Sequence, residues 1–157
     1  MAHINNFYKV SDTLSCSGQP SEAQLKELAA QKYQVIINLG LLDTLYALKD
    51  EKGFVKALNM AYYHIPVLFE TPEINSLDTF IKRMNQHEDK KIHIHCAANF
   101  RGICFAGLWL YYKDLKTKAE MMDMIEELWH PDSIWQSFLE DGVAYIDDQK
   151  QLLNKTA

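Results

Sequence analysis

The 157-residue sequence has no long apolar run and no targeting segment at its start. Its longest strongly apolar stretch, residues 103–112, is far shorter than the roughly 20 residues that a transmembrane helix needs. Residues 1–13 contain no basic cluster followed by an apolar run, which a secretory signal peptide would show. We therefore expect a cytoplasmic protein without a membrane partner. A periplasmic location stays open, because a chain whose signal peptide has been removed would look the same.

Positive charge and cysteine are also scarce. The 16 lysines and arginines stand against 21 aspartates and glutamates, which gives a formal net charge of −5 at pH 7. A general nucleic-acid partner is therefore not expected, whereas a small anion can still bind where the local field is positive. The three cysteines, Cys16, Cys96 and Cys104, are too few and odd in number for a disulfide framework, and they suit a reducing compartment.

Repeats, low-complexity tracts and Gly/Ser linkers are absent as well. Hydrophobic residues make up 48% of the chain, which excludes an intrinsically disordered protein. The length suits one domain that buries its core without a metal or disulfides. We therefore predict a single domain over residues 1–157, with its core at about 7–148.

Strand-like and helix-like segments alternate along the chain, which predicts an α/β domain. The expected strands are at 7–10, 14–17, 35–39, 62–67 and 91–96. Two helices are expected to start at capping boxes, Ser21 with Gln24 and Thr117 with Glu120.

Four further helices complete the expected pattern. One lies around residues 54–58, and another has Thr71 as its cap and Pro72 at its first position. Residues 103–113 are apolar on all sides, which is typical of a buried central helix. A last helix from about residue 132 is expected to point Ile134 inward, together with Trp135, Phe138, Leu139 and Ile146.

The segment around Cys96 carries the most informative pattern. A buried strand ends at this cysteine, a short loop follows, and a buried helix starts near Arg101. Loop amides and the first turn of a helix can cradle an anion, and their positive potential stabilises a thiolate. The planar guanidinium of Arg101 can bind two oxygens of that anion. The pattern predicts a nucleophile beneath an oxyanion, the geometry for covalent phosphoryl transfer. A structural Cys96 with a surface Arg101 is the alternative.

This segment resembles the His-Cys-x5-Arg signature of the cysteine-based protein phosphatases. His95 and Cys96 match its start, but only four residues separate Cys96 from Arg101. The usual loop glycine is missing too, although Asn99 is the residue type that best tolerates a left-handed conformation after glycine. The resemblance implies that His95 supports the loop and tunes Cys96.

A closer resemblance is to the bacterial beta-lactamase-hydrolase-like protein phosphatases. Members of that family carry a Ser-Gly-Gln-Pro element, a Val-Ile-Asn-Leu strand and a Cys-x4-Arg loop. These elements occur here in the same order, at 17–20, 35–39 (with one extra isoleucine) and 96–101. The resemblance spans nearly the whole chain. It implies the dual-specificity-phosphatase fold, a parallel-rich sheet with helices on both faces.

The expected function is therefore hydrolysis of a phosphomonoester through a phosphocysteine at Cys96, without a metal or organic cofactor. Arg101 and the loop amides would hold the phosphoryl oxygens as charge redistributes. The partner would be a phosphorylated small molecule or a phosphoprotein. The expected substrate-binding residues are Ala97, Ala98, Asn99, Phe100 and Gly102.

Two other functions stay open. Rhodanese-type sulfurtransferases also use a cysteine followed by a compact six-residue loop, and there the cavity holds a persulfide sulfur. Residues 96–101 have that length, so loop length alone favours a smaller ligand than a phosphoryl group. A catalytically weak, anion-binding regulatory protein is the third reading of the same residues.

The proton donor for the leaving group is harder to assign. In the resembling families it is an aspartate on a mobile loop before the cysteine, and the corresponding part of this sequence holds none. Glu70, in the loop before the helix of residues 74–84, is the candidate, and a solvated loop carboxylate is the alternative. Glu73 is expected in the first turn of that helix, where an acidic side chain stabilises the helix dipole.

Histidine and the remaining cysteines give weaker patterns. His93 and His95 share one face of a strand, but a single His-x-His pair without a nearby carboxylate does not predict a metal site. Cys104 is expected to be a buried small hydrophobe rather than a resolving cysteine. Phe100 either lines the pocket mouth or packs in the core.

Overall fold

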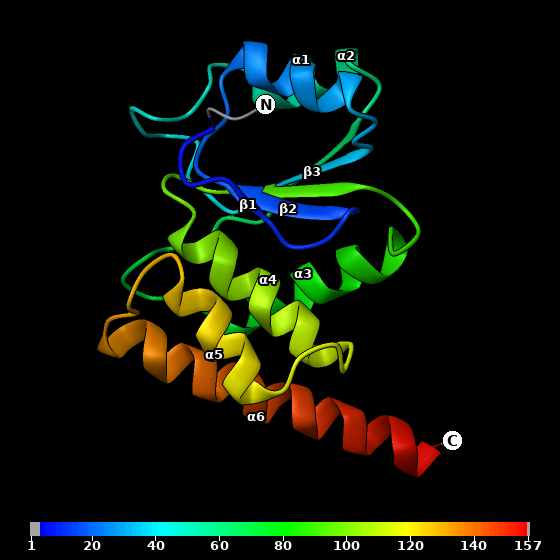
Figure 1. Ribbon diagram of the computed structural model, residues 1–157, viewed down its shortest axis with the longest axis vertical. Helices are drawn as coiled ribbons and strands as arrows, with labels where there is room; N and C mark the ends of the chain where they lie inside the picture. The colour runs from blue at the N-terminus through cyan, green and yellow to red at the C-terminus, as the bar shows by residue number, and fades with distance from the viewer. Residues whose placement is uncertain (1–3, 157) are drawn as a thin grey trace.

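The computed structural model describes residues 4–156, which form a five-stranded sheet with helices on both faces (Figure 1). The strand order is β1–β2–β5–β3–β4; β1 is antiparallel to β2, and the other neighbouring strands are parallel. The strands are β1 (Tyr8–Lys9), β2 (Leu14–Ser17), β3 (Val35–Asn38), β4 (Ala61–His64) and β5 (Ile92–His95). The expected single α/β domain with a parallel-rich sheet is confirmed.

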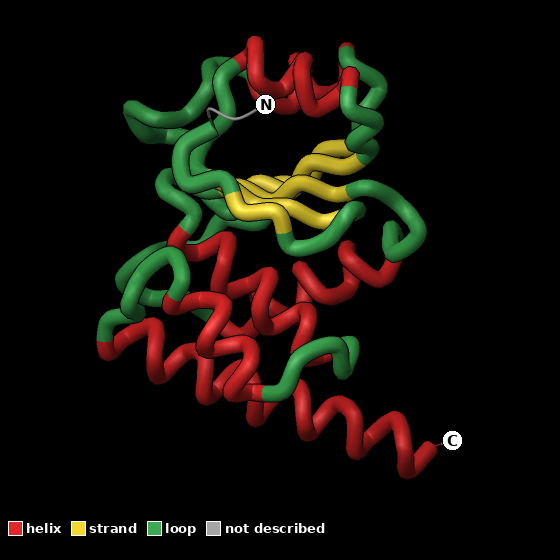
Figure 2. The backbone as a smooth tube through the Cα atoms, viewed as in Figure 1, coloured by secondary structure: helices red, strands yellow, loops and turns green. Residues whose placement is uncertain are grey.

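Two helices cover one face of the sheet and four lie on the other (Figures 1 and 2). The first layer holds α1 (Glu22–Ala30) and α2 (Glu51–Ala57). The second holds α3 (Ile74–Gln86), α4 (Phe100–Tyr112), α5 (Lys118–Glu126) and α6 (Ser133–Thr156). No helix within residues 4–156 is long and apolar enough to cross a membrane.

Local sequence explains most of these elements. Every residue of β2, β3 and β5 is buried, as expected for parallel strands covered on both faces. Residues 101–110 of α4 are all buried, which confirms the central helix that the apolar run predicted. Both capping boxes are present, at Ser21 with Gln24 and at Thr117 with Glu120.

Two local expectations are wrong. The third helix begins at Ile74 and not at Pro72, because the backbone of Glu73 is still extended, with φ −122° and ψ 143°. Glu73 therefore takes the cap position in place of Thr71, without a side-chain capping bond. Ile134 is 42% exposed at the rim of an open depression, while its neighbour Trp135 takes the fully buried position.

Candidate active site

Cys96 lies at the edge of the sheet where the parallel strands end. The register pairs His95 of β5 with Ser17 of β2 and with Asn38 of β3. Cys96 follows directly and is 1% exposed. Its backbone N–H donates to the Ser17 carbonyl over 3.3 Å, so β2 as well as β5 fixes its position. The loops after β3 and β5 gather at this edge, on the left of Figure 1.

The loop after Cys96 leads into the open N-terminus of α4. Asn99 has the left-handed conformation that its residue type suggested, with φ 69° and ψ 8°. Its side chain makes no capping bond; instead its Nδ2 donates to the carbonyl of Asn6 over 2.8 Å. The first helical amide with an intrahelical acceptor is that of Ile103, which donates to the Asn99 carbonyl. The preceding amides, at residues 100–102, are therefore available to an anion.

Arg101 is only 6% exposed although it carries a charge. Its Nη1 donates to the carbonyl of Val67 over 2.7 Å, and its Nη2 lies 3.5 Å from the hydroxyl of Tyr46. Both acceptors are uncharged, and none of the ion pairs found within residues 4–156 includes this arginine. A buried guanidinium without a counter-ion favours an anionic ligand strongly, because an uncompensated buried charge is costly.

The Ser-Gly-Gln-Pro element braces the loop. The backbone N–H of Gln19 donates to the Ala97 carbonyl over 3.1 Å, and that of Gly18 donates to the Asn5 carbonyl over 2.7 Å. A Cβ atom on Gly18 would lie 2.5 Å from the Ala97 oxygen, so the close approach of the two segments requires glycine here. The Nδ2 atom of Asn6 donates to the Ala98 carbonyl over 2.9 Å.

His95, the residue before the cysteine, is paired with a buried carboxylate. Its Nε2 lies 2.5 Å from Oε2 of Glu51, in the first turn of α2, and the two side chains are 0% and 1% exposed. The Nε2 atom of Gln19 donates to the other carboxylate oxygen over 2.8 Å. The carboxylate of Glu51 therefore contacts both His95 and Gln19, the residue that braces the loop. Nothing in the sequence had singled out this carboxylate.

Phe100 packs against a second aromatic ring. Its ring is stacked on Trp129, with centroids 4.6 Å apart and planes 9° apart. Phe69 approaches the same tryptophan, with centroids 5.8 Å apart, and its carbonyl accepts from the indole N–H of Trp135. Phe100, Trp129 and Phe69 are partly exposed, whereas Trp135 is buried. The three partly exposed rings form an aromatic wall that starts next to the loop.

Glu70 lies one residue beyond this wall, in the loop between β4 and α3. Its side chain is exposed and lines an open depression together with Ser133, Ser137 and Asp141. The same loop contacts the candidate site three residues earlier, where the Val67 carbonyl accepts from Arg101. Glu70 is therefore carried by a segment that touches the site, and the depression that it lines also includes residues from the start of α6.

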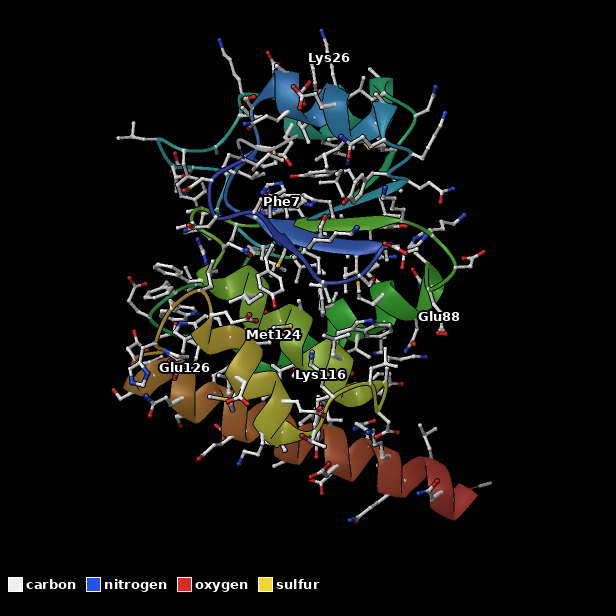
Figure 3. All side chains as sticks on the ribbon, in the orientation of Figure 1. Phe7, Lys26, Glu88, Lys116, Met124 and Glu126 are labelled. Atoms are coloured by element: carbon white, nitrogen blue, oxygen red, sulfur yellow. The ribbon has the colours of Figure 1, made fainter. Side chains whose placement is uncertain are left out.

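His93 belongs to a buried polar network on the α1 side of the sheet. Its Nδ1 lies 2.7 Å from Ser15 Oγ, its Nε2 lies 2.7 Å from Ser17 Oγ, and Ser15 Oγ lies 2.6 Å from the Tyr33 hydroxyl. Phe7 stacks on the imidazole at 5.9 Å and is labelled on this side of the sheet in Figure 3. Burial, with a smaller effect of His95, holds the pKa of His93 well below its usual 6.5.

Within residues 4–156, no group of three potential metal ligands is close enough to hold an ion.

The other two cysteines, Cys16 and Cys104, are buried in surroundings that suit a structural role. Burial raises the pKa of the Cys16 thiol to about 12, and burial also raises the pKa of the Cys104 thiol. Both thiols therefore stay protonated at neutral pH, so neither is suited to be a nucleophile.

No protein-family model and no curated protein sequence matches the chain. Solved structures do. A protein from Shewanella putrefaciens CN-32, named "Putative phosphatase (DUF442)", is 28% identical, with a TM-score of 0.84 over 90% of this chain and 91% of that one. The chain has the fold of the cysteine-based phosphatases.

Two more distant structures share this fold and were solved with anionic ligands. The core catalytic domain of the PP-IP phosphatase SIW14 from S. cerevisiae, in complex with citrate, is 18% identical, with a TM-score of 0.77 over 98% of this chain and 93% of that one. PTPMT1 in complex with PI(5)P is 10% identical, with a TM-score of 0.78 over 93% and 99%. The implied dual-specificity-phosphatase fold is thus confirmed.

Proposed function

We propose that this protein is a cysteine-dependent phosphatase that hydrolyses a phosphomonoester at Cys96. The observation that carries the proposal is the buried Arg101. Its guanidinium has only uncharged partners, and it lies in the first turn of α4, whose open amides at residues 100–102 come after the short loop that follows Cys96. This arrangement suits a dianionic group held above a sulfur atom. The shared fold with cysteine-based phosphatases supports the same reading.

The reaction has two steps. In the first, the Cys96 thiolate attacks phosphorus, the S–P bond forms, and the bond from phosphorus to the leaving oxygen breaks. Arg101 and the amides of residues 97–102 hold the equatorial oxygens in the transition state. In the second step, water attacks the phosphocysteine, inorganic phosphate leaves, and the thiolate is regenerated. Neither step needs a metal or an organic cofactor.

Glu70 is the proposed proton donor to the leaving oxygen. Its support is the loop that carries it, which reaches Arg101 through Val67. A proton donor matters most for a poor leaving group, since a good one departs as an anion. Glu70→Gln should therefore slow hydrolysis of an alkyl phosphate more than that of p-nitrophenyl phosphate. Equal effects on the two substrates would exclude this role for Glu70.

We propose a phosphorylated small molecule or a phosphoprotein as the substrate. The structure similar to this one that holds PI(5)P shows that the fold can bind a phosphorylated ligand. The net charge of −5 argues against a nucleic-acid partner.

The decisive experiment is p-nitrophenyl phosphate hydrolysis across pH, with Cys96→Ser and, as a matched control, Cys104→Ala. Turnover should fall by about 10³-fold or more in Cys96→Ser, which should still bind inorganic phosphate. Cys104→Ala should retain turnover, because it removes a buried thiol that is not a nucleophile. Full activity of Cys96→Ser would overturn the proposal.

The same proteins distinguish the alternatives. Transfer of sulfur from thiosulfate to cyanide, without phosphate hydrolysis, would identify a sulfurtransferase. Phosphate binding without either activity would identify an anion-binding regulatory protein. A bound oxyanion next to Arg101 would suit all three functions, so binding alone does not choose among them.

A further inference from the structure

Tyr46 brings a hydroxyl group to Arg101 from a different part of the chain. It lies in the loop between β3 and α2, and Nη2 of Arg101 lies 3.5 Å from its oxygen. The backbone N–H of Leu41 donates to the same oxygen over 2.8 Å. A phenolic hydroxyl has two lone pairs and one proton. Both of these contacts use a lone pair, so neither engages the proton.

The loop holds this hydroxyl in place. A Cβ atom on Gly40 would lie 3.1 Å from Cε1 of Tyr46 and 3.2 Å from its oxygen, so the ring packs directly on the Gly40 backbone. That backbone is anchored on both sides: its N–H donates to Asn38 Oδ1 over 2.8 Å, and its carbonyl lies 2.6 Å from His64 Nε2. A donor fixed before binding loses little entropy when a ligand arrives.

We propose that Tyr46 binds the substrate oxyanion together with Arg101, by donating its phenolic O–H to a phosphoryl oxygen. The proposal rests on the proposed function only for the identity of the ligand, a tetrahedral oxyanion. Arg101 supplies charge, and Tyr46 supplies a neutral donor directed to an oxygen beside the guanidinium. Such a second donor favours a phosphoryl group, with several projecting oxygens, over a single persulfide sulfur.

Titration calorimetry with inorganic phosphate tests this role. Tyr46→Phe removes the hydroxyl and keeps the ring, and it should weaken phosphate binding about 10- to 100-fold, as expected for a hydrogen bond to a charged group. The matched control is Tyr62→Phe. Tyr62 also presents a half-buried hydroxyl near this edge of the sheet, but that hydroxyl accepts from Asn38 Nδ2 and is not one of the hydrogen-bond partners of Arg101. The control should bind phosphate within about twofold of the wild type.

A second measurement on the unmodified protein separates a binding role from a structural one. Phosphate should produce a downfield hydroxyl proton resonance in the NMR spectrum, and this resonance should be missing from Tyr46→Phe. If Tyr46→Phe is folded and binds phosphate like the control, the proposal is wrong. If Tyr46→Phe does not fold, absence of the resonance in the wild type overturns the proposal by itself.

The outcomes also separate this proposal from the proposed function. Phosphate binding that depends on Tyr46, without any phosphatase activity, would support the binding role of Tyr46 and overturn the proposed phosphatase function. Phosphatase activity with unchanged phosphate affinity in Tyr46→Phe would support the phosphatase function and overturn the binding role of Tyr46. A wild-type protein that binds no phosphate would overturn the role of Tyr46.

Discussion

Glu51 and His95 form a pair 2.5 Å apart that is sealed from solvent and joins the first turn of α2 to the residue before Cys96. The pair lies between the sheet and the α1–α2 layer, whereas Arg101 and its partners hold the loop from the far end. The loop is therefore fixed at both of its ends by contacts with distant segments. Removing one partner of a buried pair is expected to be costly, because the other is left without its hydrogen bond.

A double-mutant cycle on this pair should show coupling. Glu51→Gln, His95→Gln and the double variant should each be measured for the free energy of unfolding in urea and for kcat/KM. Because the two side chains share one hydrogen bond in a dry site, we expect a coupling energy of about 0.5–3 kcal/mol in stability. The same sign of coupling should appear in kcat/KM if the pair positions Cys96. Purely additive effects in both measurements would contradict this view.

The Gly18–Ala97 contact leads to a second prediction. Gly18→Ala places a Cβ atom 2.5 Å from the Ala97 oxygen, so the loop must move. The variant should be destabilised by about 1–3 kcal/mol, as for other overpacked sites, and its phosphate affinity should fall. Urea unfolding and calorimetry measure the two effects.

Ser21→Ala, three residues later, is the matched control for Gly18→Ala. It removes the capping box of α1 and should cost about 1 kcal/mol of stability. It does not touch the loop, so its phosphate affinity should equal that of the wild type. The idea that Gly18 positions the loop would fail if both variants kept full affinity.

Sequence reasoning could predict the strand–Cys–loop–helix order because each part of it is local. Four buried residues precede Cys96, ten buried residues start at Arg101, and Asn99 takes the left-handed conformation that few other residue types tolerate. Capping boxes gave two helix starts for the same reason. Thr71 and Pro72 failed as a helix start, because such signals mark a region and not a residue.

The partners that hold the site could not be predicted in this way. Tyr46 lies in the loop between β3 and α2, and Glu51 is the first residue of α2. The sequence around them has no periodicity that indicates burial. Their positions depend on how α2 packs over the sheet and on how the loop after β3 folds back to Arg101. One signal was available for Gln19, since it lies in the Ser-Gly-Gln-Pro element, but its contact with Glu51 is a tertiary one.

Asn99 allows a third prediction from a matched pair of variants. Asn99→Gly keeps access to φ 69° but loses the hydrogen bond from the side-chain Nδ2 to the Asn6 carbonyl. Asn99→Ala loses both the easy access to this conformation and the hydrogen bond. Since the backbone of a residue other than glycine or asparagine is strained in the left-handed region, Asn99→Ala should be less stable than Asn99→Gly by about 1 kcal/mol. Phosphate affinity should follow the same order. Equal stabilities, measured by urea unfolding, would show that the conformation of residue 99 does not limit the loop.

A fourth prediction concerns the dependence of stability on pH. The pKa of His93 lies well below 6.5 in the folded protein, while the unfolded chain takes up a proton near 6.5. Above that pH both states have a neutral imidazole and stability is at its full value. As the pH falls below 6.5, only the unfolded state gains the proton, so the free energy of unfolding falls by up to about 1.4 kcal/mol per pH unit.

Urea unfolding at about pH 7.5, 6.5, 5.5 and 5.0 measures this slope. His93→Gln is the informative comparison, because glutamine can hydrogen-bond to Ser15 or Ser17 but does not titrate. The variant should be less stable at pH 7.5, yet its stability should fall less steeply in acid. His87, whose pKa is also lowered by burial, remains in both proteins and adds the same slope to each. Parallel curves for the two proteins would mean that His93 takes up its proton at the same pH in the folded and unfolded states. The Ser15–His93–Ser17 network would then be able to accommodate a charge.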